Sequence, residues 1–363
     1  MVPNNSLLRS FQLHQEEYEA KALEVLRSGW YVLGKEVSSF EEEFAAYVGS
    51  KFCVGVDNGL NAIVLGIKAL DIQEGDEVIV AANTYIATAL GVSLNKVTPV
   101  FVDADEYHNI DPAKIEAAIT PKTRAVLVTH FYGQACRMKQ IKEICDKHGI
   151  YLLEDCAQAH GAENNGAQVG TWGIMGFFSF YPTKNLGGFG DGGAVTTNDP
   201  ALDQKLRALR NYGSIVRYQN DYEGHNSRLD ELQAGLLRVK LKYMQEIIEE
   251  RRYIAKRFME EVKNPLIEMP KTAEACTHVY HLFVVQVADR DRFREHLKAA
   301  GVSSDVHYPV PPYLAKPYRH LGYTEADFPM TEHLYSRIVS IPIFTGMHKE
   351  EQDAIIAAMN SYR

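Results

Sequence analysis

FCVGVDNGLNAIVLGIKAL, residues 52–70, contains the structural unit on which this chain is built. Its first five residues are apolar or small, and they predict a buried strand over residues 52–56. A turn at residues 57–59 follows, and the apolar residues after it predict a helix over residues 60–70. Gly59 would let backbone N–H groups at the start of that helix approach a phosphate, although a turn of this kind often only reverses the chain.

The same alternation of strand and helix continues for more than a hundred residues. We expect strands at residues 77–80, 98–102, 125–129, 150–154, 176–180 and 193–197, and helices at residues 12–29, 37–48, 85–94, 112–119 and 138–148. Strands that alternate with helices pair in parallel through right-handed crossovers, so we expect an α/β fold with a mostly parallel central sheet and helices on both faces. Ligands of such sheets bind beyond the carboxyl ends of the strands.

A lysine in a loop of small residues follows one of the expected strands. Lys184 lies in Ser-Phe-Tyr-Pro-Thr-Lys-Asn, residues 179–185, just before the glycine-rich run at residues 187–193, and Asp155 ends the apolar strand at 150–154. A lysine can form a Schiff base with an aldehyde, and a carboxylate can keep a pyridine nitrogen protonated. The pair predicts a pyridoxal phosphate (PLP) site, whereas Lys184 taken alone is more often a surface lysine.

Four more positions near the strand ends are candidates for cofactor binding. The backbone at Leu60 would approach the phosphate, and Tyr85 would stack on the pyridine ring. Gln158 would bond the phenolic oxygen of the cofactor, and Ser179 its phosphate. Each of these residues, taken singly, is explained equally well by a role in the core, in a turn or at a strand end.

Length and pattern predict two domains. The 363 residues exceed one ordinary small core, and 46% hydrophobic with 23% charged residues is typical of a globular protein. We expect a large PLP-binding domain over residues 1–240 and a smaller C-terminal α+β domain over residues 241–363. A long helical stretch at residues 229–262 would connect them. The second domain would contain a strand at residues 281–287 and helices at residues 290–300 and 349–359.

The composition also argues against several classes of partner. The formal net charge of −9 disfavours a nucleic-acid or anionic-membrane surface, because such partners need a clustered positive patch. The five cysteines form no CxxC pair, so neither a disulfide framework nor a metal site is expected. The sequence shows no signal segment and no apolar run long enough to span a membrane, and we expect a cytoplasmic protein.

Taken together, the motifs resemble those of the DegT/DnrJ/StrS family of PLP-dependent nucleotide-sugar aminotransferases, from end to end. The matching segments are residues 28–37, 58–62, 154–161, 179–185, 190–194 and 224–234. The resemblance implies the aspartate aminotransferase-like fold (PLP fold type I). It also implies a homodimer with shared active sites, in which Asn226 of one subunit reaches the cofactor phosphate of the other. Two departures are Leu60, which lacks the hydroxyl that many members have there, and Thr183, where several members have glycine.

Within the family, the segments around Lys184 and Asn58 look most like enzymes that act at C3 of a dTDP-3-keto-6-deoxyhexose with L-glutamate as amino donor. The product would be a dTDP-3-amino-3,6-dideoxyhexose for glycan or antibiotic biosynthesis, with 2-oxoglutarate released. Some relatives are dehydratases with histidine in place of the lysine, and Lys184 argues against that activity. The resemblance also suggests a sugar pocket; its candidate residues are His160, Tyr181, His307, Tyr308 and Tyr313.

Three alternatives remain open from the sequence. The chain could aminate C4 of a 4-keto-6-deoxysugar, act on a free amino acid, or be a non-catalytic regulator that keeps the fold. A regulator should have lost cofactor residues, and Asp155, Gln158, Ser179 and Lys184 are all present. A buried core histidine is the better interpretation of His160 as far as direct catalysis is concerned.

Overall fold

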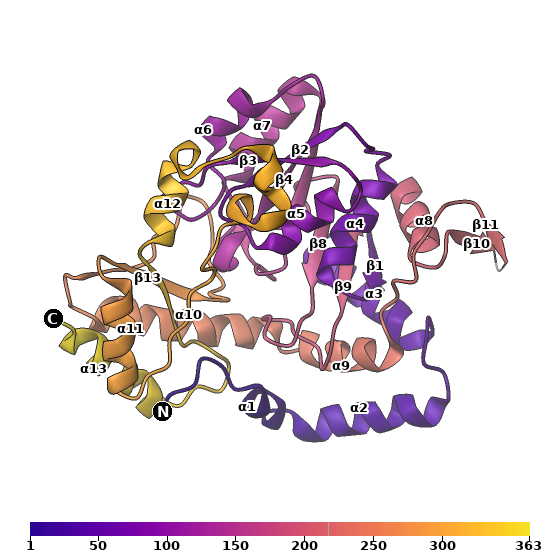
Figure 1. Cartoon of the computed structure of the whole chain (residues 1–363). Helices are drawn as coiled ribbons and strands as arrows, with labels where there is room; N and C mark the ends of the chain where they lie inside the picture. The colour runs from indigo at the N-terminus through magenta and orange to yellow at the C-terminus, as the bar shows by residue number, and fades with distance from the viewer. Residues whose placement is uncertain (217) are drawn as a thin grey trace.

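A seven-stranded sheet forms the centre of the molecule in the computed structural model, which describes residues 1–216 and 218–363 (Figure 1). The strand order is β1-β9-β8-β5-β4-β2-β3. The strands are β1 (Phe52–Val56), β2 (Glu77–Ala81), β3 (Thr98–Val102), β4 (Thr123–Thr129), β5 (Tyr151–Asp155), β8 (Met175–Ser179) and β9 (Gly193–Thr197). β9 runs antiparallel to both of its neighbours, and the remaining neighbouring pairs are parallel. The mostly parallel sheet expected from the sequence is confirmed.

Helices cover both faces of this sheet. On one face lie α4 (Gly59–Ala69), α5 (Ile86–Ser93) and α8 (Pro200–Leu209), and on the other lie α3 (Lys35–Val48), α7 (Met138–His148) and α9 (Glu231–Leu241). Side chains of β4 show why both faces are apolar. Ala125 and Leu127 pack into the core on the side of α4, α5 and α8, whereas Val126 and Val128 pack into the core on the side of α7. A strand that is buried on both sides needs apolar residues at consecutive positions.

The C-terminal part forms a second, smaller core. Its antiparallel sheet contains β12 (Ile267–Glu268), β13 (Phe283–Val287) and β14 (Ile338–Ile341). The helices α10 (Met244–Glu261), α11 (Arg290–Ala299) and α13 (Lys349–Ser361) pack on it. The long helical stretch expected at residues 229–262 is two helices, α9 and α10, because the chain turns at Lys242 and Tyr243.

Segments from both ends of the chain pack across the expected domain boundary at residue 240. The N-terminal Val2 pairs with Val302 and belongs to the C-terminal core, ahead of α1 (Leu7–Gln12) and α2 (Gln15–Ser28). In the opposite direction, Tyr313 and Phe328 enter the core of the large sheet. The boundary itself stays a prediction, but the two cores are joined by more than the α9–α10 connection.

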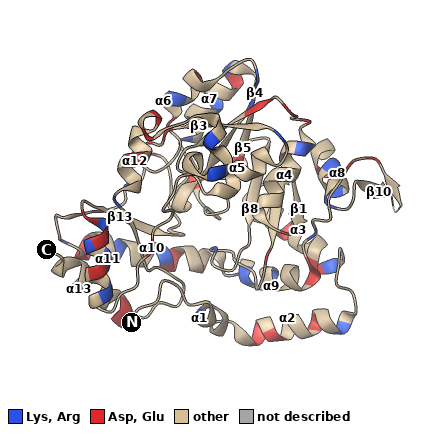
Figure 2. Ribbon diagram, in the orientation of Figure 1, with Lys and Arg blue, Asp and Glu red and all other residues tan. Residues whose placement is uncertain are grey.

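The remaining short elements complete the description. They are α6 (Pro112–Ile115), α12 (Pro329–Tyr335), β6 (Glu163–Asn164), β7 (Ala167–Gln168), β10 (Ser214–Val216), β11 (Gln219–Asn220) and the 3₁₀ turns at residues 116–118, 131–133, 312–314, 316–321 and 325–327. Lys and Arg are interspersed with Asp and Glu along the helices (Figure 2), as in the contacts of Arg238 with Glu36 and Glu43. No helix in the described residues combines the length and apolarity of a membrane span.

Candidate active site

Most of the site residues predicted from the sequence lie together at one edge of the large sheet. Because the strands other than β9 point the same way, the last residues of β4, β5 and β8, which are Thr129, Asp155 and Ser179, meet at that edge. They line a cavity of about 550 Å³ that also includes residues from the C-terminal part. Predicted site residues in this cavity are Gly59, Leu60, Tyr85, Asp155, Gln158, Ser179, Tyr181, Lys184, His307 and Tyr308.

Lys184 enters the cavity from the turn after β8. Its backbone N–H donates to the Tyr181 carbonyl oxygen at 2.8 Å, which closes the turn. Removal from water disfavours the charged ammonium and lowers the pKa of Lys184 to about 8, against a smaller opposing effect of the Asp155 carboxylate. An amine with such a pKa is partly neutral near pH 8 and can act as a nucleophile or base.

Asp155 is held in the cavity wall by two hydrogen bonds. The Thr88 hydroxyl donates to Oδ2 at 2.7 Å, and the Ala157 backbone N–H donates to Oδ1 at 3.1 Å. Burial raises the pKa of this carboxyl group, and the two donors together with the nearby Lys184 oppose that rise. Among the residues that the structure describes, none brings a cation into direct contact with this buried carboxylate, and a protonated ring nitrogen would supply one.

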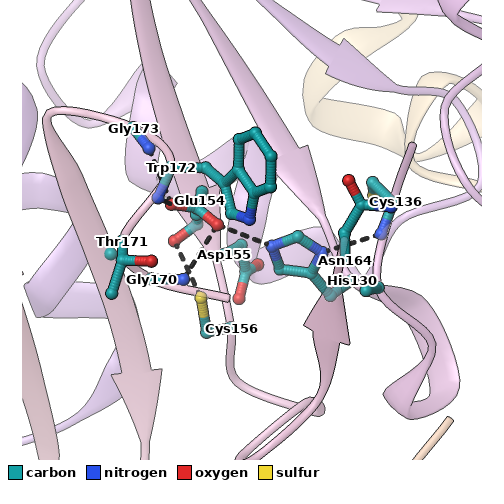
Figure 3. Close-up of polar contacts among 12 residues, drawn as sticks. His130, Cys136, Glu154, Asp155, Cys156, Asn164, Gly170, Thr171, Trp172 and Gly173 are labelled. Atoms are coloured by element: carbon teal, nitrogen blue, oxygen red, sulfur yellow. Dashed lines mark hydrogen bonds and ion pairs between the residues drawn. The ribbon is translucent and has the colours of Figure 1, made fainter. Parts of the chain in front are cut away.

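The neighbouring Glu154 does not line the cavity, and its carboxylate is bonded to His130 and to the segment at residues 170–173 (Figure 3). Its Oε1 accepts from the backbone N–H groups of Trp172 and Gly173, both at 2.8 Å. Its Oε2 accepts from the Gly170 backbone N–H at 2.8 Å and from His130 Nε2 at 3.1 Å. His130 Nδ1 accepts from the Cys136 backbone N–H, which places the imidazole proton on Nε2.

These hydrogen bonds argue against a metal site formed by His130, Glu154 and Cys156. Their ligand atoms lie within 4.8 Å of one another in the described part of the chain. Both imidazole nitrogens and both carboxylate oxygens are already occupied by hydrogen bonds, so the group is a structural anchor. It holds the segment at residues 170–173 against β5, whereas Asp155, the next residue of that strand, lines the cavity.

The turn between β1 and α4 forms another wall. The Asn58 side chain caps α4 by accepting from the Asn61 backbone N–H at 2.9 Å. A Cβ added at Gly59 would lie 2.6 Å from the Ser179 Cβ, so only glycine lets this turn approach the end of β8. The start of α4 and the Ser179 hydroxyl thus face the same cavity, as phosphate binding requires.

Aromatic and histidine side chains line the side of the cavity toward the C-terminal part. The rings of Tyr85 and Tyr308 lie 4.5 Å apart between centroids. Gln158 Nε2 donates to the Tyr308 hydroxyl at 3.4 Å, and Gln158 Oε1 accepts from the Tyr132 backbone N–H at 2.7 Å. His307 Nδ1 lies 2.8 Å from the Ser340 hydroxyl.

Three predicted site residues lie elsewhere. Tyr313 was expected to line the sugar pocket, and that expectation is corrected: it is fully buried in the core beside Phe101 and Phe328, with its hydroxyl bonded to Glu332. Its ring packs against Phe101 of β3 and against Phe328, so packing decides its place. His160 is also fully buried, between Phe178 and Phe180, and does not line the cavity.

Asn226 also lies outside the cavity of its own chain. It is exposed, in a segment that pairs with Asn211, and the next residue, Ser227, donates its hydroxyl to Asp57 at 2.5 Å. That position leaves open the predicted role toward a second subunit.

Several residues of the cavity wall were not predicted from the sequence. Thr88 and Thr129 contribute hydroxyls, His281 a buried imidazole, and Asn4 and Asn5 carboxamides from the N-terminal segment. The position of Thr88, three residues after Tyr85 in the first turn of a helix at a strand end, is a signal that could have pointed to it. The sequence around Asn4 and around His281 contains no pattern that indicates a binding site, because both residues reach the cavity only through long-range packing.

The residues present fit PLP. A 550 Å³ cavity contains a partly neutral lysine, a buried carboxylate without a directly bound cation, and a glycine turn at a helix start. These three features match the aldehyde, ring nitrogen and phosphate of the cofactor, respectively.

Comparisons with known proteins agree with this geometry. The DegT/DnrJ/EryC1/StrS aminotransferase family matches residues 12–360. A dTDP-3-amino-3,6-dideoxy-alpha-D-galactopyranose transaminase of Aneurinibacillus thermoaerophilus is 47% identical, with 100% of this chain and 99% of the relative covered. A dTDP-3-amino-3,4,6-trideoxy-alpha-D-glucose transaminase of Streptomyces venezuelae is 43% identical, with 98% and 93% covered. The crystal structure of S. venezuelae DesV with a ketimine intermediate superimposes with a TM-score of 0.97 at 42% identity, over 99% of this chain and 97% of that one.

Proposed function

The chain belongs to the DegT/DnrJ/EryC1/StrS aminotransferase family, and we propose that it moves an amino group from L-glutamate to C3 of a dTDP-linked 3-keto-6-deoxyhexose. The observation that carries the proposal is that Lys184 and Asp155, 29 residues apart in sequence, line one cavity together with Gly59 and Ser179. Two unrelated cavities would have separated the nucleophile from its acidic partner. The family is PLP-dependent, and bound PLP supplies an aldehyde that exchanges amino groups and a ring that withdraws electrons.

Each residue of the cavity has a separate task in this proposal. With PLP bound, Lys184 Nζ would move a proton between the substrate carbon and the C4′ carbon of the cofactor, which its lowered pKa permits. Asp155 holds the ring nitrogen protonated, Gly59 and Ser179 bind the phosphate, and Gln158 orients the ring through its edge. Tyr85 and Tyr308 cover the ring side and exclude water from the reacting atoms.

The configuration of the sugar is the finer part of the proposal. The transaminase of A. thermoaerophilus carries a galacto product in its name, and its 47% identity extends over the whole chain. We therefore favour dTDP-3-keto-6-deoxygalactose, which gives dTDP-3-amino-3,6-dideoxygalactose. His307 and Tyr308, on the C-terminal side of the cavity, are the side chains expected to meet the sugar.

A homodimer is a further part of the proposal, and its location would be the cytoplasm. Exposed apolar residues gather next to the segment that carries Asn226: Trp30 is 63% exposed and Tyr212 is 52% exposed. Val32 pairs with Asp230 and Asn211 with Asn226, which joins these segments into one surface. An apolar surface of this kind is typical of a contact with a second copy.

The reaction is tested with purified, PLP-loaded protein, L-glutamate and dTDP-sugars that carry the keto group at C3 or at C4. The expected result is 2-oxoglutarate formation with the 3-keto sugar and an amine located at C3 by NMR. An amine at C4, or turnover without any nucleotide sugar, would overturn the proposal. Lys184→Ala should abolish turnover and the visible absorbance of lysine-bound PLP.

Subunit complementation tests the shared site. Lys184→Ala and Asn226→Ala subunits should each be impaired alone. When both are mixed and allowed to exchange, one site per mixed dimer combines an intact lysine with an intact asparagine, so activity should return. If Asn226 serves its own chain, no combination of these subunits restores a complete site, and mixing should leave activity unchanged.

A further inference from the structure

A row of three buried threonines stands behind Asp155. Thr88 Oγ1 lies 2.7 Å from Asp155 Oδ2 and 2.7 Å from Thr84 Oγ1, and Thr84 Oγ1 lies 2.9 Å from Thr129 Oγ1. They come from three places: Thr84 from the turn after β2, Thr88 from the first turn of α5, and Thr129 from the end of β4. None of the three is more than 4% exposed.

The chemistry of hydroxyl groups gives this row a direction. Each threonine has one proton to donate, and an ionised carboxylate can only accept. Thr88 therefore spends its proton on Asp155, Thr84 must donate to Thr88, and Thr129 must donate to Thr84. The three O–H bonds thus point toward the same carboxylate oxygen, and hydrogen bonds aligned in a row polarise one another.

The opposite alignment is less favourable. If Asp155 carried a proton and donated it to Thr88, each hydroxyl would turn around, and the Thr129 proton would be left at the end of the row. Among the residues that the structure describes, Thr129 would then find the Thr88 oxygen at 3.5 Å, which is longer than a good O–H···O bond. The row consequently favours the ionised carboxylate over the protonated one.

We propose that Thr88 is a positioning residue that, backed by Thr84 and Thr129, keeps Asp155 ionised and aimed into the cavity, so that the ring nitrogen of bound PLP retains its proton. The inference rests on the proposed function in one respect, since it requires that PLP binds. Loss of the Thr88 hydroxyl would make Asp155 a stronger base, because the carboxylate loses its shortest hydrogen bond. The shared proton would then move from the ring nitrogen to Asp155, and the ring would withdraw electrons less strongly.

The decisive experiment uses Thr88→Val, which keeps the shape of the side chain and removes the hydroxyl. The measurement is the ¹⁵N NMR shift of PLP labelled at the ring nitrogen, bound to the full-length protein without substrates. The native chain should give a protonated-type shift and Thr88→Val a shift toward the neutral type. Affinity for PLP, measured by equilibrium binding, should fall roughly tenfold or more, as expected when a hydrogen bond to a charged group is lost.

Three further variants separate this role from a purely structural one. Thr88→Ser restores the hydroxyl and should restore the protonated-type shift. Thr84→Val should give a smaller change in the same direction, because it removes the second hydroxyl of the row. Thr197→Val removes a buried hydroxyl that bonds the Ile174 carbonyl oxygen at 2.9 Å, on β9, which β8 separates from β5 and Asp155, and should leave the shift unchanged.

The possible results separate failure of the inference from failure of the proposed function. An unchanged ¹⁵N shift in a folded, PLP-binding Thr88→Val protein overturns the inference and leaves the proposed function intact. An equal change in Thr197→Val also overturns it, because the effect would then follow from any lost buried hydroxyl. Failure of the native chain to bind PLP would overturn both the inference and the proposed function.

Discussion

Replacement of Glu154 by glutamine is the sharpest test of how the site is held. The carboxylate accepts four hydrogen bonds, two on each oxygen, from three backbone N–H groups and His130. A glutamine amide keeps one oxygen and turns an NH₂ group toward two donors. His130 cannot change its tautomer to accept, because its Nδ1 already accepts from Cys136. At least two charge-assisted bonds are lost, which should cost about 3–6 kcal/mol of unfolding free energy.

Urea unfolding of cofactor-free Glu154→Gln, followed by circular dichroism, measures this cost. The matched control is Glu42→Gln, an exposed position in α3 where the same change should alter stability by less than about 0.5 kcal/mol. We also expect weaker PLP binding, because the segment at residues 170–173 and the end of β5 lose their common anchor. If Glu154→Gln unfolds within about 1 kcal/mol of the native chain, the saturated bonding of Glu154 does not stabilise the site as we infer.

Three further predictions concern the cavity. Asp155→Asn should keep the fold but lower PLP affinity by roughly tenfold to a hundredfold, since the ring nitrogen loses its charged partner; unchanged affinity in a binding titration would contradict this. Gly59→Ala should weaken PLP binding more than it weakens folding, because the added Cβ would lie 2.6 Å from the Ser179 Cβ; equilibrium binding and thermal melting of the same sample compare the two effects. The third prediction concerns Lys184, whose pKa is lowered from 10.5 to about 8 in the folded protein. Between these two pH values the unfolded chain binds more protons than the folded one, so the free energy of unfolding rises as the pH rises from about 8 to 10.5. Lys184→Met should remove this rise, which amounts to roughly 3 kcal/mol, and parallel pH profiles of the two cofactor-free proteins would refute the assignment.

The sequence located most elements of the large sheet because their signals are local. Residues 52–56, 98–102 and 193–197 are strands with the expected bounds, and the helix at 138–148 also agrees. Short runs of mainly apolar, β-branched or small residues next to polar residues such as Asp57, Asp103 and Asn198 mark these strands without distant contacts. The break between α9 and α10 was missed because the apolar pattern continues through Lys242 and Tyr243.

Strand direction and packing depended on distant parts of the chain. β9 is reversed because it follows β8 through a loop that returns directly beside it, which no periodicity within residues 193–197 reveals. Tyr313 lies in a segment that resembles a sugar pocket, yet its ring is buried against the core of the large sheet. A short aromatic segment has the same sequence pattern whether it lines a pocket or packs in a core, because both environments bury apolar surface.

What the sequence determined by itself is the identity of the reacting groups: a lysine just before a glycine-rich run and a carboxylate at a strand end, with the turn at Gly59. The chemistry of these residue types, together with their positions at the ends of strands, is enough to indicate a PLP site. The tertiary structure decided what surrounds them, including the hydroxyl row behind Asp155, the anchor at Glu154 and the arrival of Asn4 from the far end of the chain. Such contacts join residues tens to hundreds of positions apart, and only the folded chain brings their atoms within bonding distance.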